Sequence, residues 1–286
     1  MGQQKIYCII RLVLLLIVFS FGIWLAWSNF AIEKTHYRIM CERIPQSFHG
    51  FMIAQVSDLH NTEFGKDNRN LVKKLTEAEP DIIVITGDMI DSRRTDLQTV
   101  LDFAKKIVEI CPVYYVNGNH ESRISEYEML KTGLEACGVI VLENRKVELV
   151  RNSDTITLLG VSDPAFYRDS LAGDSKTLMK TVLSQLQQDR DGYTVLLSHR
   201  PELFEVYADT GIDLVFSGHT HGGQFRLPFI GGLVAPDQGF FPEYDSGLFT
   251  EENTAMIISR GLGASVIPIR FYNRPEIVLA ELASCK

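Results

Sequence analysis

The chain begins with one long apolar run and continues as shorter patterned segments. Residues 12–27, LVLLLIVFSFGIWLAW, contain no charged side chain, and residues 28–32 add a mildly polar end. As a helix, residues 12–32 would span about 31 Å, which matches a bilayer core of about 30 Å. The pattern predicts an uncleaved transmembrane anchor. The alternatives are a buried core helix and a cleaved signal peptide, although no small-residue cleavage site follows the run.

Beyond residue 50, short apolar runs alternate with segments of helical period. Leu71 and Leu75 predict a helix over residues 67–79, and a second helix is expected over residues 95–110. Thr95 with Gln98, and Ser125 with Glu128, stand in capping-box positions at the starts of the second and third helices. Further helices are expected over residues 125–137, 175–187 and 201–207.

Eight strand-like runs lie between these helices: FMIAQVS, DIIVITG, PVYYVNG, TITLLGVS, YTVLLS, DLVFSG, TAMIISR and EIVLAELA. Several are apolar throughout, which is typical of strands covered on both faces. The order of elements predicts an α/β fold with a mixed sheet, or two packed sheets with helices outside. No linker or repeat interrupts residues 51–286, so we expect one domain there. Residues 33–50 would connect it to the anchor, and residues 1–32 would form a short cytoplasmic tip and the anchor itself.

The charge balance restricts the class of partner. The net charge is −8, and because the first 32 residues hold two positive charges and no negative ones, the remainder carries −10. Nucleic-acid-binding domains have the opposite balance, so we do not expect nucleic acid as a partner. The five cysteines have no CxxC spacing and predict neither a zinc cluster nor a disulfide framework.

Candidate chemistry appears where the apolar runs end. Five of them are followed by Asp, Asn or His, and five of the seven histidines of the chain belong to this set. Any one such residue could be a helix cap or a surface group, but the five ends together predict a site at the carboxyl edge of the strands. Imidazole, carboxylate and amide groups without thiolate favour two divalent ions such as Mn, Fe or Zn. The residues are Asp58, His60, Asp88, Asn119, His120, His199, His219 and His221.

The motifs DLH, GD, GNHE, SH and GHTH, in this order, resemble those of the calcineurin-like metallophosphoesterases from about residue 51 to the C-terminus. GHTHGGQFRLP and the tail SRGLGASVIPIRFYNRPEIVLAEL are similar to the membrane-anchored bacterial YkuE-like branch. The resemblance implies a four-layer α/β/β/α sandwich of two mixed sheets. It also implies a phosphoesterase, with relatives that include UDP-2,3-diacylglucosamine pyrophosphatases.

The resemblance further implies a role for each motif residue. One ion would take Asp58, His60 and His221, the other Asn119, His199 and His219, and Asp88 would bridge both. A hydroxide between the ions would attack phosphorus, and His120 would stabilise the phosphoryl oxygens or protonate the leaving group. The chain departs from the common GNHD motif at Glu121, so the residue that orients His120 stays open.

Four arginines in the C-terminal half bear on the substrate. Arg226, Arg260, Arg270 and Arg274 are candidates for a phosphate contact, Arg226 and Arg274 foremost, with a surface ion pair as the alternative for each. Residues 225–249 would form a lip for a bulky or lipid-like substrate, or a packed loop. We expect hydrolysis of a phosphodiester or pyrophosphate bond, in a lipid or cell-envelope precursor. The alternatives are a phosphoprotein or nucleotide phosphatase, and a non-catalytic membrane-anchored scaffold.

The membrane orientation is not set by charge. Two basic residues precede the apolar run and three follow it closely, so the positive-inside rule does not choose a side. From the anchor and the resemblance we expect a single-pass protein of the cell membrane with its domain outside the cytoplasm.

Overall fold

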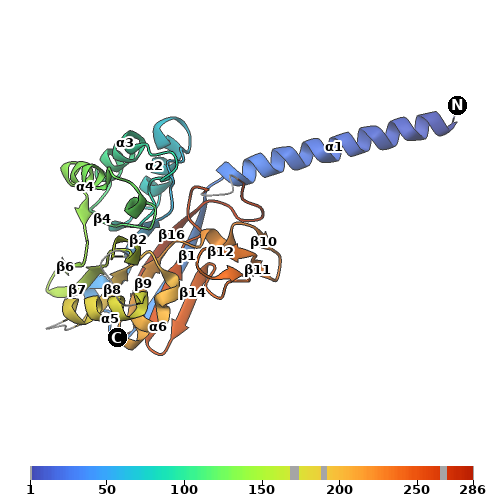
Figure 1. Ribbon diagram of the computed structural model, residues 1–286. Helices are drawn as coiled ribbons and strands as arrows, with labels where there is room; N and C mark the ends of the chain where they lie inside the picture. The colour runs from blue at the N-terminus through green and yellow to red at the C-terminus, as the bar shows by residue number, and fades with distance from the viewer. Residues whose placement is uncertain (1, 168–173, 188–191, 265–268, 286) are drawn as a thin grey trace.

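The computed structural model describes residues 2–167, 174–187, 192–264 and 269–285 (Figure 1). Its first element, helix α1 (Gly2–Phe30), projects away from the rest of the chain as a single rod. Residues Gln3–Phe30 are long and apolar enough to cross a membrane, and the domain buries none of their most apolar stretch. The helix is therefore a candidate membrane span.

Six strands form the first sheet, in the order β1-β16-β2-β3-β4-β5. Strands β2, β3, β4 and β5 are parallel, whereas β16 is antiparallel to β2 and parallel to β1. Because of these directions, β1 begins at the same edge of the sheet at which β2, β3 and β4 end. The bounds are Glu33–Cys41 (β1), Phe51–Val56 (β2), Ile82–Thr86 (β3), Val113–Val116 (β4), Ile140–Val141 (β5) and Glu276–Ser284 (β16).

The second sheet also has six strands, in the order β14-β15-β9-β8-β7-β6. Its four inner strands are parallel, and β14 and β6 pair antiparallel at the two edges. The bounds are Arg145–Arg151 (β6), Asp154–Gly160 (β7), Tyr193–Leu197 (β8), Leu214–Ser217 (β9), Gly247–Glu251 (β14) and Thr254–Ile258 (β15).

Helices cover the outer faces of both sheets. Alternate residues of each strand face opposite ways, so Val56 and Ile85 pack against helices while Ile53 and Val84 pack between the sheets. A third apolar core lies under the helices of the second sheet. The helices are α2 (Arg69–Thr76), α3 (Leu97–Ile107) and α4 (Tyr127–Ala136) on the first sheet, and α5 (Ser175–Leu186) and α6 (Phe204–Asp209) on the second. The expected four-layer α/β/β/α sandwich is confirmed.

Two short hairpins connect β9 to β14 on the side of the domain from which α1 projects (Figure 1). One pairs β10 with β11 and the other pairs β12 with β13. The first hairpin is tied to the C-terminal segment, because Arg226 N–H donates to Phe271 O at 3.0 Å. The bounds are Arg226–Leu227 (β10), Gly231–Gly232 (β11), Val234–Ala235 (β12) and Gly239–Phe240 (β13).

Both predicted capping boxes are wrong. Helix α3 is capped by Asp96, whose side chain accepts from Thr99 N–H at 3.2 Å, so Thr95 stands outside the helix. Helix α4 begins at Tyr127 without a side-chain cap, and the Ser125 hydroxyl donates to the Glu126 carboxylate instead. In both cases the helix begins later than the pattern suggests.

Segment 33–50 is more than a link between α1 and the domain. It contains β1, which pairs over nine residues with β16 and forms an edge of the first sheet. Only Ile39 of this strand is buried, so its sequence lacks the apolar run that marks the inner strands. Edge strands β6 and β14 went unpredicted for the same reason.

Candidate metal centre

The strand ends of both sheets meet at one edge of the sandwich. Gln55 on β2 donates through Nε2 to the Ser217 carbonyl at the end of β9, at 2.8 Å. His199, just past β8, contacts the Thr86 carbonyl at the end of β3 through Nδ1, at 2.7 Å. These contacts place the loops that follow the two sheets against each other.

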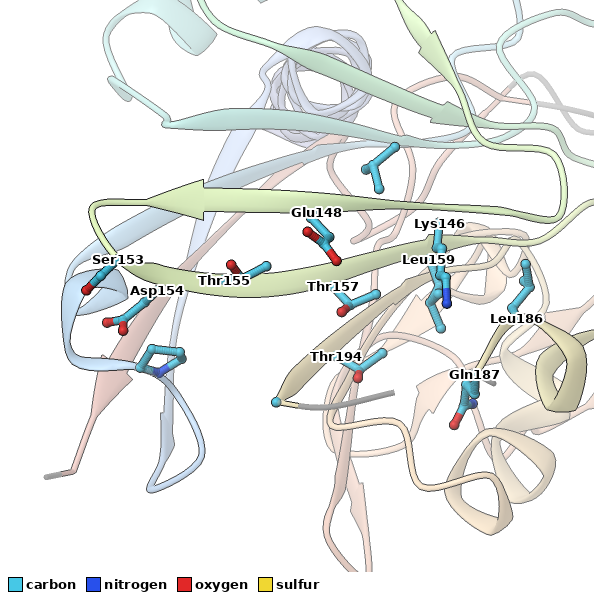
Figure 2. A pocket seen from close by; sticks show the side chains of 13 residues that line it. Lys146, Glu148, Ser153, Asp154, Thr155, Thr157, Leu159, Leu186, Gln187 and Thr194 are labelled. Carbon is cyan, nitrogen blue, oxygen red and sulfur yellow. The ribbon is translucent and has the colours of Figure 1, made fainter. Parts of the chain in front are cut away.

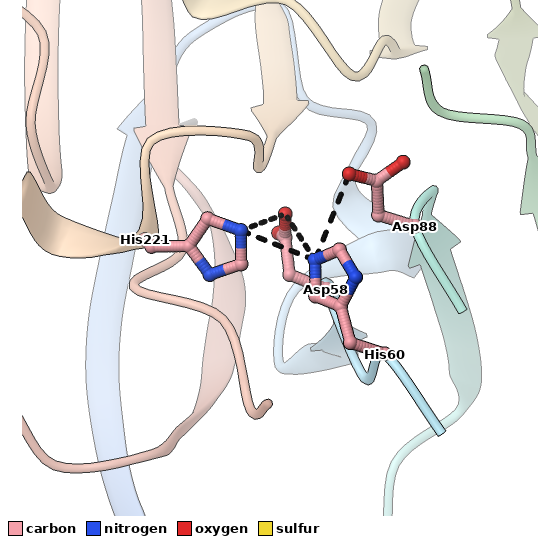
Figure 3. Close-up of side chains that lie close together, drawn as sticks. All are labelled: Asp58, His60, Asp88 and His221. Carbon is pink, nitrogen blue, oxygen red and sulfur yellow. Dashed lines mark hydrogen bonds and ion pairs between the residues drawn. The ribbon is translucent and has the colours of Figure 1, made fainter. Parts of the chain in front are cut away.

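The first group of donor atoms comes from Asp58, His60, Asp88 and His221 (Figure 3). His60 Nε2 lies 3.1 Å from His221 Nε2 and 3.7 Å from Asp88 Oδ2. His221 Nε2 is 3.4 Å from Asp58 Oδ1. All four residues are buried, so these polar atoms face one another in a site largely closed to bulk water.

A second group, formed by Asp88, His199 and His219, shares Asp88 with the first. His199 Nε2 lies 3.3 Å from Asp88 Oδ2, the same oxygen that faces His60. It also lies 3.2 Å from Asn119 Oδ1. The structure thus brings together all seven residues expected as ligands, with one carboxylate oxygen between the two groups.

The donor set fits divalent cations. His199 Nδ1 donates to the Thr86 carbonyl, so in the neutral ring Nε2 carries the lone pair and faces Asp88. His60 Nε2 lies 3.1 Å from His221 Nε2, so two ring nitrogens also face each other in the first group. Lone pairs at about 3 Å repel unless a proton or a cation lies between them. The set of imidazoles, carboxylates and an amide without thiolate suits Mn, Fe or Zn.

Burial and charge set the protonation of these histidines in the absence of a metal. Burial lowers the pKa of His60 to about 3 and holds the pKa of His221 well below its usual value. Burial would also lower the pKa of His199, but the charge and hydrogen bond of Asp88 raise it to about 10. The first group therefore presents neutral imidazoles, whereas the second retains a proton that a cation would replace.

The backbone at the site is strained. Asp58, His60, Asp88, His219 and His221 all have positive φ, between 48° and 71°. This region costs about 1–3 kcal/mol for a residue with a side chain, although Asp and His tolerate it better than most. The same crowding requires glycine, since a Cβ on Gly218 would lie 2.0 Å from Ser57 Oγ.

The residue that orients His120 is Ser92, which the sequence did not single out, and its backbone N–H makes the main contact. The Ser92 N–H donates to His120 Nδ1 at 3.1 Å, and the Ser92 hydroxyl lies 3.2 Å from the same atom. An accepting Nδ1 leaves the proton of the neutral ring on Nε2. Burial lowers the pKa of His120, which favours this neutral form. The His120 ring packs against that of His60, with centroids 4.5 Å apart.

In the described part of the chain, Glu121 binds backbone N–H groups and not the His120 ring. Its buried carboxylate accepts from the N–H groups of Asp88 at 3.0 Å, Met89 at 2.7 Å and Gly118 at 2.8 Å. These amides belong to the loops after β3 and β4. Glu121 therefore holds together the two loops that carry Asp88, Asn119 and His120.

Sequence reasoning also missed Arg200, which follows His199 directly. Arg200 is buried, donates to Asp163 from Nε at 2.6 Å and from Nη2 at 3.0 Å, and lies 3.0 Å from His219 Nε2 through Nη1. Asp237, from the loop between β12 and β13, lies 3.0 Å from the same His219 nitrogen. Arg200 could have been found from the sequence, because it directly follows the predicted ligand His199. Asp237 could not, because it lies on a loop without a strand-end motif.

The four arginines considered for phosphate binding have protein partners. Arg226 pairs with Asp245 at 2.9 Å, and Arg260 pairs with Glu276 at 2.7 Å. Arg274 donates to the Ala31 carbonyl at 2.9 Å and stacks over Trp27. Arg270 is fully buried, donates to the carbonyls of Gly263 and Arg260, and lies 3.4 Å from His221 Nδ1.

A separate hollow of roughly 650 Å³ runs along β6, β7 and β8 (Figure 2). Lys146, Glu148, Thr157 and Thr194 are among its lining residues. It contains none of the residues expected in the site, and Thr194 lies near the start of β8, away from the edge that carries His199.

The chain is similar to several known proteins along most of its length. Residues 51–223 match the calcineurin-like phosphoesterase family. The metallophosphoesterase YkuE of Bacillus subtilis is 30% identical over 88% of this chain and 86% of its own length. The phosphodiesterase YaeI of Escherichia coli is 27% identical over 81% of this chain and 82% of its own. A transmembrane protein with a metallophosphoesterase domain from Danio rerio is 28% identical over 84% of this chain and 54% of its own.

The fold has a counterpart among solved structures. The protein TT1561 of Thermus thermophilus superposes with a TM-score of 0.52 over 74% of this chain and 89% of that chain, at 13% identity. Such a likeness at low identity supports the fold alone.

Proposed function

We propose that this chain, which belongs to the calcineurin-like phosphoesterase family, uses two divalent ions to hydrolyse a phosphodiester or pyrophosphate bond. Family membership makes it a metal-dependent phosphoester hydrolase. The observation that carries the two-ion proposal is the position of Asp88 Oδ2, which faces His60 in one donor group and His199 in the other.

The proposed ligands follow the two groups. Asp58, His60 and His221 would hold one ion, Asn119, His199 and His219 the other, and Asp88 both. When bound, two such ions would lower the pKa of a water between them and stabilise charge on the phosphoryl oxygens. The chain's own contribution is to fix the donors, through the Thr86 carbonyl on His199 and the Ser57 hydroxyl on Asp58 at 2.5 Å.

His120 is the proposed proton donor. Ser92 occupies its Nδ1, so Nε2 carries the proton that can be donated to a phosphoryl or leaving-group oxygen. The contact with the His60 ring places this imidazole beside the first donor group. Ser92 acts as the positioning residue.

The proposed bond class is a phosphodiester or pyrophosphate. The Escherichia coli relative is named a phosphodiesterase, which favours a diester over a monoester. An anchored hydrolase suits a substrate at a membrane surface, so a lipid or cell-envelope precursor remains the proposed source of the phosphate. A screen of phosphomonoesters, diesters and nucleotide-sugar lipids would separate these classes from the phosphoprotein and nucleotide alternatives.

The proposed setting is a single-pass membrane protein with its domain outside the cytoplasm. Helix α1 is exposed and apolar over a sufficient length, and relatives from Danio rerio and Bos taurus are named transmembrane proteins. A reporter fused to the C-terminus should be accessible from outside intact cells. Protection of that reporter would reverse the orientation.

The direct test is hydrolysis of bis-p-nitrophenyl phosphate by the full chain in detergent with Mn²⁺. We expect turnover, and His120→Ala should lower it by about 10²–10⁴-fold while metal content stays unchanged. His36→Ala, an exposed histidine on β1, is the matched control and should behave as the unaltered chain. No turnover with any divalent metal would reject the enzyme proposal, and loss of metal in His120→Ala would make His120 a ligand.

A further inference from the structure

The domain touches α1 inside the stretch that would cross the bilayer. The Phe271 ring lies 6.5 Å from the Phe21 ring and 5.6 Å from Trp24, centroid to centroid. Arg274 stacks over Trp27 at 4.8 Å, and Asn29 donates to the Arg270 carbonyl at 3.0 Å. Three successive turns of the helix thus pack against one segment near the C-terminus.

These contacts fix the level of that segment in a membrane. About twenty helical residues cross a hydrocarbon core of about 30 Å. Wherever twenty consecutive residues are placed within the candidate span Gln3–Phe30, they include Phe21. A side chain packed against Phe21, as Phe271 is, must therefore lie at the level of the bilayer and not above it.

Further exposed apolar side chains lie near Phe271 and on the loops that pair with its segment. Of the twelve large apolar residues that the described part of the domain leaves exposed, seven lie within residues 227–241 and 269–272. They form what we term the apolar face: Leu227, Phe229, Ile230, Phe240, Phe241, Ile269 and Tyr272. Phe240 exposes 80% of its surface and Phe229 is fully exposed, which is costly for phenylalanine in water.

The two segments of the apolar face are joined by hydrogen bonds. Gln224 Nε2 donates to the Ile269 carbonyl at 2.9 Å, and Arg226 N–H donates to the Phe271 carbonyl at 3.0 Å. The hairpins of β10 to β13 lie on the side of the domain from which α1 projects (Figure 1). The apolar face is therefore continuous with the place where the anchor leaves the domain.

We propose that the apolar face is a second membrane-contact surface, which inserts into the bilayer interface beside α1. Aromatic side chains favour this region, where an apolar body can be buried while the backbone stays near water. Insertion of about 5–10 Å, as amphipathic segments achieve, would cover the exposed phenylalanines. The occupant is a lipid bilayer, and the proposal rests on α1 crossing it.

One consequence concerns the metal centre. Asn273 Nδ2 donates to the His221 carbonyl at 2.7 Å, and Arg270 lies 3.4 Å from His221 Nδ1. The segment that meets the membrane therefore also supports a predicted ligand. The edge at which β2, β3 and β4 end is the edge at which β1 leaves the anchor, so the metal centre lies at the membrane surface.

Tryptophan fluorescence of the full chain in phosphatidylcholine nanodiscs tests the surface. The chain has only two tryptophans, Trp24 and Trp27, and their quenching by lipids brominated near the headgroup end reports α1 itself. Phe229→Trp and Phe240→Trp each add one emitter on the apolar face. Met129→Trp adds one at an exposed apolar position on α4, as the matched control.

We expect brominated lipid to remove most of the emission added by Phe229→Trp and Phe240→Trp, and little of that added by Met129→Trp. All three substitutions keep an exposed apolar side chain, so the fold should persist. Equal quenching of the three added emitters would overturn the proposal. Quenching confined to the native tryptophans would also overturn it. In that case the apolar face would bind a protein partner or the apolar chain of a substrate instead of the bilayer. Neither result would affect hydrolysis of a soluble diester.

Discussion

The two donor groups that share Asp88 differ in what surrounds them. In the first group, His60 Nε2, His221 Nε2 and Asp58 Oδ1 face one another, and Arg270 lies behind them with backbone carbonyls, and no carboxylate of the described residues, as its acceptors. In the second, His219 Nε2 is occupied by Arg200 and Asp237. The first group is preorganised for a cation, whereas the second must release His219 before it can bind one. We infer that the second ion binds more weakly.

Removal of the shared residue should have the largest effect, because it reaches both groups. In Asp88→Ala the metal content should fall from about two ions per chain to below one, and turnover should fall below detection. Bound metal is measured by mass spectrometry of the purified chain. Retention of two ions would show that Asp88 is not a bridge.

The arginines behind the two groups should differ in their effect on stability. Arg200→Gln leaves Asp163 as a buried unpaired carboxylate, so the free energy of unfolding should fall by about 3–5 kcal/mol. Arg270→Gln removes donors from the carbonyls of Gly263 and Arg260 and from His221 Nδ1, all of them uncharged, and should cost about 1–3 kcal/mol.

Denaturant unfolding of the two variants measures this difference. The double variant Arg200→Gln/Asp163→Asn is the control, and it should recover part of the loss because residue 163 then carries no buried charge. If Arg200→Gln and Arg270→Gln lowered the free energy of unfolding equally, the two donor groups would not differ in the charges that surround them.

Glu121→Gln tests the carboxylate common to the loops of both groups. One amide oxygen cannot replace two carboxylate oxygens that accept from three N–H groups, so stability should fall by about 1–3 kcal/mol. The metal content should stay unchanged, and His120→Ala should still lower turnover in this background. A selective loss of turnover at unchanged stability would instead assign Glu121 to the orientation of His120.

Ser92→Ala should have the smallest effect. The backbone N–H of residue 92 still donates to His120 Nδ1, and only the hydroxyl contact at 3.2 Å is lost. One neutral hydrogen bond contributes about 1 kcal/mol, so turnover should fall by less than about tenfold. The kcat of the variant measures this, and a loss as large as that of His120→Ala would mean that the hydroxyl sets the tautomer.

The ends of the inner strands could be predicted from the sequence, because each of these strands is an apolar run followed by a polar residue. Asp58, Asp88 and His199 stand at such stops, and the parallel order of strands brings them to one edge. Edge strand β1 was not readable, since only Ile39 is buried. The role of Glu121 could not be read either, because a carboxylate that accepts backbone N–H groups from two loops is a purely tertiary feature.

The surroundings of the site depend on contacts between distant segments. Arg200 meets Asp163 and Asp237, each 37 residues away, and no local pattern marks such a pair. Phe271 meets Phe21 across almost the whole chain. Periodicity identifies an apolar or charged residue, but its partner is set by the packed fold.

If two ions share Asp88, a titration of the metal-free chain should resolve two binding steps. Mn²⁺ is added to the metal-free full chain while bound metal and hydrolysis of bis-p-nitrophenyl phosphate are followed together. Our prediction is binding in two steps, with the weaker step at the group of His199 and His219, and turnover that rises with the second ion. Saturation at one ion per chain with full turnover would contradict it.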